Sequence, residues 1–130
     1  MLTGAHEDFW RHCADGELWM QRCTECALVQ WPSVGDGLCE RCRREVVWER
    51  LSGRGQIVSW CTFERAYYPS VPVPYDTVLV ELDEGPLFVS NPRGFDRHDI
   101  TAGMAVRVCF LECEDSAGIF RLPVFERAAD

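Results

Sequence analysis

The sequence predicts a mainly β protein built of three consecutive parts: an N-terminal helix over residues 1–17, a small metal-bound ribbon over residues 18–50 and a five-stranded barrel over residues 51–130. Three observations predict this arrangement. An amphipathic stretch ends at a glycine, two Cys-x-x-Cys pairs stand twelve residues apart, and five apolar runs separated by Gly, Pro or Asp follow. At 130 residues the chain is one domain of ordinary size or two very small ones.

The first predicted element is a short helix over residues 5–14. Phe9, Trp10 and Cys13 group on one side of this helix, and Gly16 supplies its stop. A helix of about ten residues is marginal alone, so its aromatic face must be covered. The sequence leaves open whether the body of the domain or a partner protein covers it. Phe9 and Trp10 are therefore candidate partner contacts.

Four of the eight cysteines form a metal-binding pattern, Cys23-x-x-Cys26 followed by Cys39-x-x-Cys42. A two-residue spacer lets a tight turn point both sulfurs at one ion, and two such turns close a tetrahedron of thiolates. The pattern predicts one structural Zn²⁺ per chain in a rubredoxin-like zinc ribbon, held by metal because its core is small. Iron in the same sulfur cage is the alternative that ligand type leaves open. Four thiolates leave no vacant position for water, which favours a structural metal over a catalytic one.

The remaining cysteines lie mostly within apolar runs and have no partner spacing; they are Cys13, Cys61, Cys109 and Cys113. We expect them to be small buried hydrophobes. A catalytic thiol would need a nearby base, and the three histidines fall in the N-terminal stretch and in a polar turn. The sequence also contains no recognisable carboxylate pair, Ser/His/Asp order or phosphate loop, so it assigns no catalytic residue.

From Leu51 onward the pattern changes to strands of roughly even spacing. The expected strands cover residues 55–65, 76–83, 87–92, 105–113 and 118–125, with tight turns at 83–86 and 115–118. Five strands with little helix favour a small Greek-key barrel, and the OB-fold is the commonest barrel of that size.

Two stretches of the barrel are candidate contact sites. Loop 66–75 carries three prolines and three tyrosines, and it is either an exposed connector or a contact surface. The Gly-Arg-Gly stretch at residues 53–55 either marks a bend at the first strand or lets the backbone approach a pyrophosphate. The candidate contact residues in these stretches are Arg54, Tyr67, Tyr68 and Tyr75.

Charge and composition exclude several classes of function. All thirteen basic residues are Arg, and without Lys the chain supports neither Schiff-base chemistry nor a phosphate-loop Lys. A net charge of −8 disfavours nucleic-acid binding, although a local Arg patch could act against it. No run approaches the roughly 18 to 20 apolar residues of a membrane span, and the first residues lack the features of a signal peptide. We therefore expect a cytoplasmic protein that binds no membrane.

The order of these parts resembles a known family. The quoted stretches are Phe9-Trp10, Gly16-Glu17-Leu18, the two Cys-x-x-Cys pairs, residues 51–60 (LSGRGQIVSW), residues 103–108 (GMAVRV) and residues 122–125 (LPVF). Together they are similar to the acyl-CoA-associated zinc-ribbon/OB-fold proteins catalogued as domain-of-unknown-function family thirty-five, over nearly the whole chain. The sequence departs from that pattern at Ala27, where Gly commonly follows the second Cys, and at Glu40, where Pro commonly follows the third.

The resemblance implies a non-catalytic accessory subunit or domain that binds and supports a thiolase-superfamily enzyme. Such enzymes include acetoacetyl-CoA thiolases and the lipid-transfer-protein-like aldolases of steroid side-chain degradation. The resemblance places the chemistry in the partner and implies acyl-CoA as a further ligand. One rival hypothesis is a stand-alone enzyme that uses Cys61, Cys109 or Cys113. The other is a single-stranded nucleic-acid binder, because zinc ribbons and OB barrels recur in such proteins. Its only local basic excess is Arg41, Arg43, Arg44, Arg50 and Arg54, which Glu40, Glu45 and Glu49 interrupt.

Overall fold

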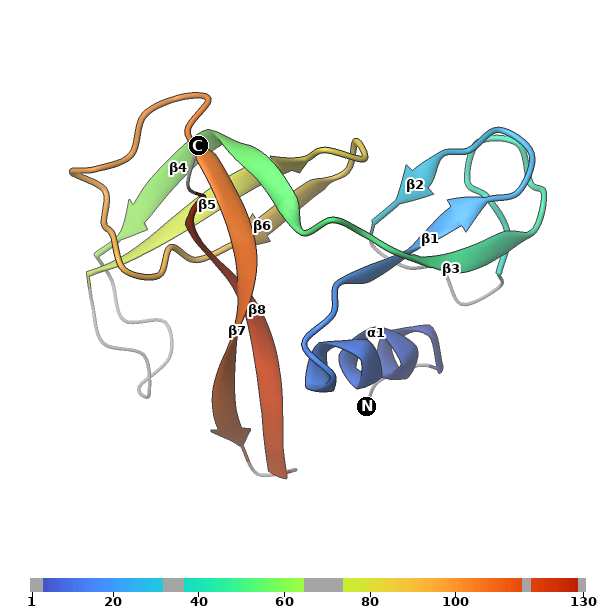
Figure 1. Ribbon diagram of the computed structural model, residues 1–130, viewed down its shortest axis with the longest axis horizontal. Helices are drawn as coiled ribbons and strands as arrows, with labels where there is room; N and C mark the ends of the chain where they lie inside the picture. Colours follow the sequence, from blue (N-terminus) through green and yellow to red (C-terminus); the bar gives the residue numbers. More distant parts are fainter. Residues whose placement is uncertain (1–3, 32–36, 65–73, 116–117, 129–130) are drawn as a thin grey trace.

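The computed structural model describes residues 4–31, 37–64, 74–115 and 118–128 (Figure 1). In this part of the chain one helix precedes two antiparallel sheets, of three and five strands. The three-stranded sheet lies on one side of the molecule and the five-stranded sheet on the other (Figure 1). The prediction of a mainly β fold is confirmed.

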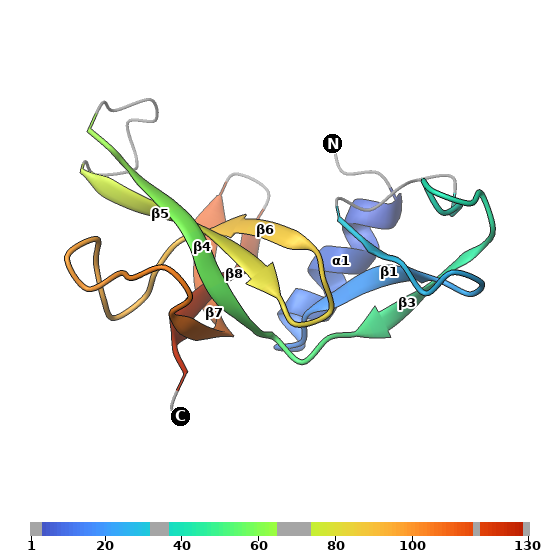
Figure 2. The same ribbon diagram turned by 90° about the horizontal axis from the view of Figure 1, so that it is seen from above.

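Helix α1 (Gly4–Ala14) ends close to the predicted residue. Gly16 adopts φ 77°, a conformation that glycine accepts easily, and the N–H groups of Asp15 and Glu17 donate to the carbonyl of His12. The helix contacts β1 of the small sheet and β8 of the barrel, so it joins the two (Figure 2). Phe9 is only 2% exposed, because the body of the domain covers it. Phe9 is therefore a core residue covered by the domain itself, one of the two covers that the sequence left open, and its contact with a partner stays a prediction.

The small sheet consists of β1 (Trp19–Cys23), β2 (Val29–Gln30) and β3 (Val46–Arg50), in the order β2-β1-β3. β1 pairs along its whole length with β3, from Trp19 opposite Arg50 to Cys23 opposite Val46. Each Cys turn follows or precedes one of these short strands. The sheet thereby presents both turns at the same end.

The barrel consists of β4 (Arg54–Phe63), β5 (Tyr75–Leu82), β6 (Leu87–Ser90), β7 (Ala105–Asp115) and β8 (Gly118–Arg127). Their order is β6-β5-β4-β7-β8, with antiparallel neighbours. A parallel bridge between Pro92 and Phe125 brings the two edges together. The barrel is nearly closed and resembles an OB-fold, as predicted. Its strands begin within one residue of the predicted positions, and β7 and β8 form a longer hairpin than expected.

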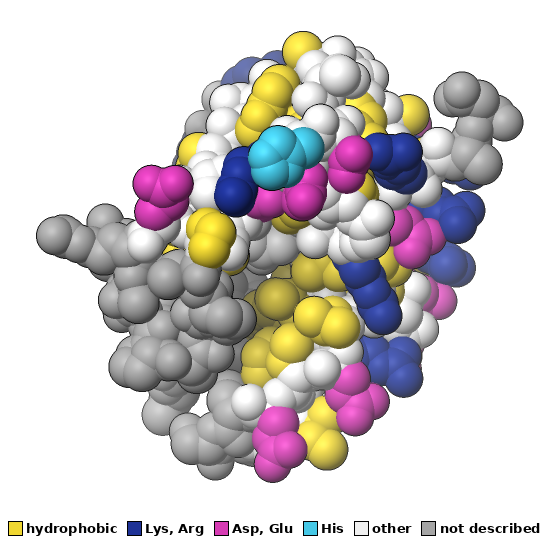
Figure 3. Space-filling view, turned by 90° about the vertical axis from the view of Figure 1, so that its left-hand side faces the viewer, with side chains coloured by type: hydrophobic (Ala, Val, Ile, Leu, Met, Phe, Trp, Pro, Cys, Tyr) yellow, Lys and Arg dark blue, Asp and Glu magenta, His cyan; other side chains and the backbone are white. Residues whose placement is uncertain are grey.

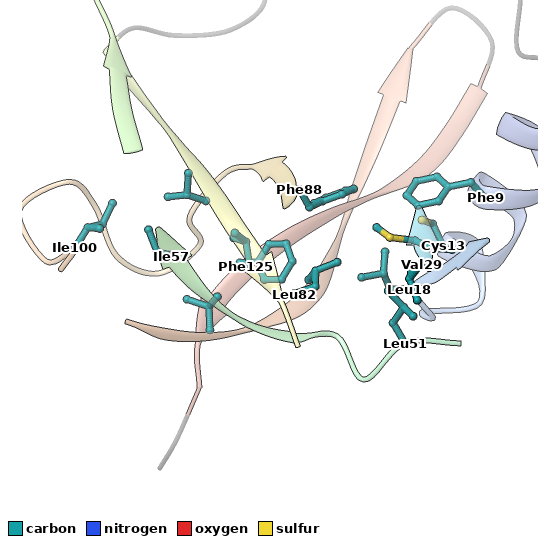
Figure 4. Packing of buried hydrophobic residues seen from close by; sticks show 14 residues of the cluster. Phe9, Cys13, Leu18, Val29, Leu51, Ile57, Leu82, Phe88, Ile100 and Phe125 are labelled. Carbon is teal, nitrogen blue, oxygen red and sulfur yellow. The ribbon is translucent and has the colours of Figure 1, made fainter. Parts of the chain in front are cut away.

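A continuous core links the helix, the small sheet and the barrel (Figure 4). The ring of Phe9 lies 4.5 Å from that of Trp31 and 6.4 Å from that of Phe88, measured between centroids. Phe88 in turn lies 6.1 Å from Phe125 inside the barrel. These rings connect the metal-binding part of the chain to the barrel interior.

The Gly-Arg-Gly stretch forms a close approach between strands. Gly53 adopts φ 77°, and a Cβ there would lie 2.5 Å from the side chain of Val108. A Cβ at Gly55 would lie 2.5 Å from the carbonyl oxygen of Glu81. Packing of the barrel's own strands accounts for both glycines, which favours the bend over a pyrophosphate-binding loop.

Among the described residues, no helix is long and apolar enough to cross a membrane.

Candidate metal centre and the surfaces around it

The four predicted ligands, Cys23, Cys26, Cys39 and Cys42, come together at the end of the small sheet. Their sulfur atoms all lie within 4.8 Å of one another. Individual Sγ–Sγ distances are 3.3 Å for Cys23 and Cys42, 3.6 Å for Cys26 and Cys42, and 3.7 Å for Cys26 and Cys39. A tetrahedral ion with metal–sulfur bonds of about 2.3 Å requires sulfurs about 3.8 Å apart. The cluster therefore fits one four-coordinate ion.

Backbone amides point at the sulfurs. The N–H groups of Glu25 and Cys26 donate to Cys23 Sγ at 3.4 Å, and the N–H of Arg41 donates to Cys39 Sγ at 3.4 Å. Such donors stabilise the thiolate, which is the form that binds metal. The backbone N–H of Leu28, followed by the Arg41 guanidinium, lowers the pKa of Cys26 to about 6.

Neighbouring sulfurs oppose full ionisation of the cluster. The backbone N–H of Arg44 favours the Cys42 thiolate, but interactions with the other cysteines, Cys23 first, together with desolvation raise the pKa of Cys42 to about 12. Four thiolates at this separation repel one another unless a cation lies between them. The donor set thus matches a divalent metal held by thiolates.

The two Cys turns share one backbone conformation. Ala27 has φ 63° and Arg43 has φ 64°, and each directly follows the second Cys of its turn. This is the position at which Ala27 departs from the family's usual glycine. The left-handed conformation reverses the chain, so that the Cys23 N–H donates to the Leu28 carbonyl at 2.9 Å and the Cys39 N–H to the Arg44 carbonyl at 2.7 Å.

Hydrogen bonds also connect one turn to the other. The N–H and the hydroxyl of Thr24 both donate to the Glu45 carbonyl at 3.1 Å, and the Arg41 guanidinium donates to the Cys26 carbonyl at 3.3 Å. Buried Gln30 accepts the N–H of Glu40 at 3.1 Å. The protein itself therefore positions the two turns relative to each other.

The other predicted contact residues lie apart from the metal centre. Trp10 is half-buried, with its ring 5.8 Å from that of Phe120, and Arg54 is exposed at the start of β4. Tyr75 stacks on Phe63 at 5.0 Å. Tyr67 and Tyr68 lie outside the described residues.

The structure separates the remaining cysteines by environment. Cys13 is fully buried, and desolvation raises its pKa to about 12. Desolvation also raises the pKa of Cys109, which is partly buried, whereas Cys61 is exposed. His12, one of the three histidines considered as a base for a catalytic thiol, stacks on Trp19 at 4.2 Å. Burial as small hydrophobes holds for Cys13 and not for Cys61.

A groove of about 460 Å³ lies between the helix, the end of β2 and the barrel. Its lining residues are Phe9, Trp10, Trp31, Leu87, Phe88, Val89, Ser90, Asn91, Leu122 and Pro123. Trp31, Leu87 and Val89 were not among the contact residues predicted from the sequence. The run of consecutive apolar residues in β6 was the sequence feature that indicated this groove. A strand that is apolar on both faces is typical of a strand that is covered on both faces.

A solved structure matches the chain over almost its full length. A chain of the Ltp2-ChsH2(DUF35) aldolase superposes with a TM-score of 0.84 at 28% sequence identity, covering 98% of each chain. The family model for the ChsH2 C-terminal OB-fold domain matches residues 48–111. The chain belongs to the DUF35 family.

Relatives of this DUF35 chain differ in length. A DUF35 domain-containing scaffold protein of Methanocaldococcus jannaschii is 29% identical over 105 residues, which cover 78% of this chain and 73% of that protein. A probable enoyl-CoA hydratase alpha subunit of Thermomonospora curvata is 32% identical over 123 residues, 92% of this chain. The DUF35 chain spans only 37% of that relative's length.

Proposed function

We propose that the chain is a non-catalytic accessory subunit or domain that binds and supports a thiolase-superfamily acyl-CoA enzyme. The observation that carries this proposal is the likeness over 98% of both chains to a chain of an aldolase assembly. Likeness to a scaffold protein of the same family supports it independently. The finer proposal is that the partner is a lipid-transfer-protein-like aldolase of steroid side-chain degradation in the cytoplasm.

The metal proposed for the four-Cys centre is Zn²⁺. Zn²⁺ has no geometric preference from d electrons and takes four thiolates in closed structural sites. Bound there, it would neutralise the thiolates and hold the two turns together, without a free position for a reacting water. Cys23, Cys26, Cys39 and Cys42 would all be ligands.

The chemistry is proposed to lie in the partner. Among the described residues, the four-Cys cluster is the one group of three or more His, Cys, Asp or Glu side chains placed to hold a metal. The raised pKa values of Cys13 and Cys109 make these thiols poor nucleophiles near neutral pH.

The nucleic-acid hypothesis finds little support in the surface charge. On the face drawn in Figure 3, basic and acidic side chains are interspersed around a hollow that apolar side chains line. Single-stranded nucleic acid binds to continuous basic grooves, and its affinity depends on neutralising phosphates. A chain of net charge −8 repels phosphates over most of its surface.

A paired assay tests the proposal. The chain is co-expressed with a thiolase-fold enzyme, and the complex is sought by gel filtration. Turnover is then measured for the enzyme alone, the chain alone and both together. We expect a stable complex, no turnover by the chain alone, and a gain of activity or solubility for the enzyme. Submicromolar oligonucleotide binding with no effect on the enzyme would favour the nucleic-acid class instead.

A further inference from the structure

The barrel is incompletely closed along the seam between β6 and β8. Two backbone hydrogen bonds begin a parallel ladder there: the Phe125 N–H donates to the Asn91 carbonyl at 3.1 Å, and the Arg93 N–H donates to the Phe125 carbonyl at 2.8 Å. Residues two apart on a strand face the same neighbour, so residue 123 would supply the next donor. That residue is Pro123, which has no N–H. The ladder therefore stops at Pro123.

A side-chain hydrogen bond joins the two strands at the point where the backbone ladder stops. The hydroxyl of Ser90 donates to the Pro123 carbonyl at 2.9 Å, and both Ser90 and this bond are buried. The bond satisfies the carbonyl of β8 without engaging the backbone of β6. It fixes the distance between the two strands while leaving the edge of β6 unpaired.

The backbone groups of Leu87 and Val89 face this open seam. The Leu82 N–H donates to the Pro86 carbonyl at 2.9 Å, which sets the alternation of hydrogen bonds between β5 and β6. In an antiparallel pair, alternate residues bond to the partner strand, so Phe88 and Ser90 pair with β5. The N–H and C=O groups of Leu87 and Val89 then point away from β5, and no backbone group in the described part of the chain pairs with them.

The same edge borders the groove of about 460 Å³, here called the seam groove. Leu87 and Val89 are 50% and 65% exposed, and Phe9, Trp10, Trp31 and Phe88 also line the groove. No charged side chain is among the described residues that line it. An unpaired strand edge beside an apolar groove has the two features that recognise an extended peptide.

We propose that the seam groove accepts an extended, uncharged segment of the partner enzyme as an added strand. The segment pairs its backbone with Leu87 and Val89 and inserts an apolar side chain between the aromatic rings. Ten of the residues that the structure describes line the groove, fewer than the roughly 20 to 30 residues per side of a standard interface. The groove therefore holds one anchoring strand of a larger contact. The identity of the partner rests on the proposed function.

Two variants of Val89 test the pairing. Val89→Pro removes the outward N–H and spares the bonds of Phe88 and Ser90 to β5, whereas Val89→Asp keeps the N–H and places a charge at the edge. The matched control is Val47→Asp, because Val47 is 44% exposed on β3 of the small sheet, outside the groove. Near-UV circular dichroism and thermal melting establish which variants are folded. If Val89→Pro does not fold, Val89→Asp alone tests the pairing.

Binding of the chain to the co-expressed thiolase-like enzyme is measured by calorimetry, and amide hydrogen exchange is followed at Leu87 and Val89. We expect binding at least tenfold weaker for both Val89 variants and unchanged for Val47→Asp, with slowed exchange at both amides in the complex. Equal binding by all variants, or weaker binding without slowed exchange, would overturn strand addition and leave the accessory function standing. Absence of any complex with the wild-type chain would overturn both proposals.

Discussion

Ala27 and Arg43 adopt the same left-handed backbone conformation, with φ of 63° and 64°, one residue after the second Cys of their respective turns. Neither residue is a glycine, and the left-handed conformation costs free energy in any residue that has a Cβ, so both turns are strained. The strain is repeated because both turns must reverse the chain in the same way around one ion. It provides a direct test of the turn geometry.

Ala27→Gly is expected to stabilise the protein. Removing the Cβ relieves about 1 to 2 kcal/mol of strain, and the greater freedom of Gly in the unfolded chain offsets about 0.4 to 1 kcal/mol of this. The expected gain is about 0.5 to 1 kcal/mol in the free energy of unfolding, measured by denaturant titration of the metal-loaded protein. Ala105→Gly is the control: Ala105 lies in β7 with an ordinary φ, and its replacement is expected to destabilise. A loss of stability in Ala27→Gly would contradict the left-handed turn.

Cys39→Ser is expected to lose most of the bound metal. Cys39 is fully buried within the sulfur cluster, and metal binding in such sites is worth on the order of 10 kcal/mol. Elemental analysis of the wild-type protein should give close to one zinc per chain. Cys61→Ser changes an exposed thiol outside the cluster, and this variant should retain the bound metal. A wild-type protein purified without metal, with the same fold and stability, would remove the basis for a structural zinc.

Gln30→Leu is expected to loosen the second Cys turn. The Gln30 side chain accepts the N–H of Glu40 and donates to Gln21 and to the carbonyl of Leu38, and Gln30 itself is buried. Removing these bonds should cost about 1 to 3 kcal/mol in the free energy of unfolding and should weaken metal binding in a chelator competition. Gln56→Leu is the control, because its bond to Glu81 is exposed. Equal effects of the two changes would show that Gln30 has no special role in the turn.

The stability of the barrel is expected to fall at acid pH through Asp76. Desolvation favours the neutral acid, but the hydroxyl of Thr62 and the N–H and guanidinium of Arg97 outweigh it and lower the pKa of Asp76. A lowered folded-state pKa contributes stability above the unfolded pKa of about 3.9, and this contribution is lost as the pH falls through the folded pKa. Asp76→Asn should therefore be about 1 to 3 kcal/mol less stable than the wild type at pH 7. As the pH falls from 5 to 2, the variant should lose less stability than the wild type does. Parallel stability curves for both proteins over that range would exclude this contribution.

The order of elements was predictable because local signals specify it. Two Cys-x-x-Cys pairs constrain the chain by metal geometry, and Gly16 and the turn at 83–86 interrupt the apolar pattern with residues that favour reversal. The sequence also predicted that the four cysteines come together, since they are close in the chain. Each of these features depends on neighbours within about twenty residues.

The surroundings of the aromatic residues could not be predicted in the same way. Phe9 and Trp10 are adjacent on one helix, yet Phe9 is buried and Trp10 is half-buried. Their environments depend on Phe88 and Phe120, which are about 80 and 110 residues away in the chain. The seam groove arises from the same distant packing: the apolar run of β6 indicates one part of its lining, and the other lining residues come from distant parts of the chain.

The contact between α1 and β8 has a consequence for synthesis of the protein. Trp10 packs against Phe120, so the ribosome must add about 110 further residues after Trp10 before this contact can form. At about 5 to 20 residues per second, the aromatic face of the helix stays uncovered for roughly 5 to 20 seconds. During that interval the nascent chain lacks the residue that packs against Trp10, so chaperones and neighbouring polypeptides can reach this side chain. The completed surface around α1 therefore forms only after β8 has been synthesised.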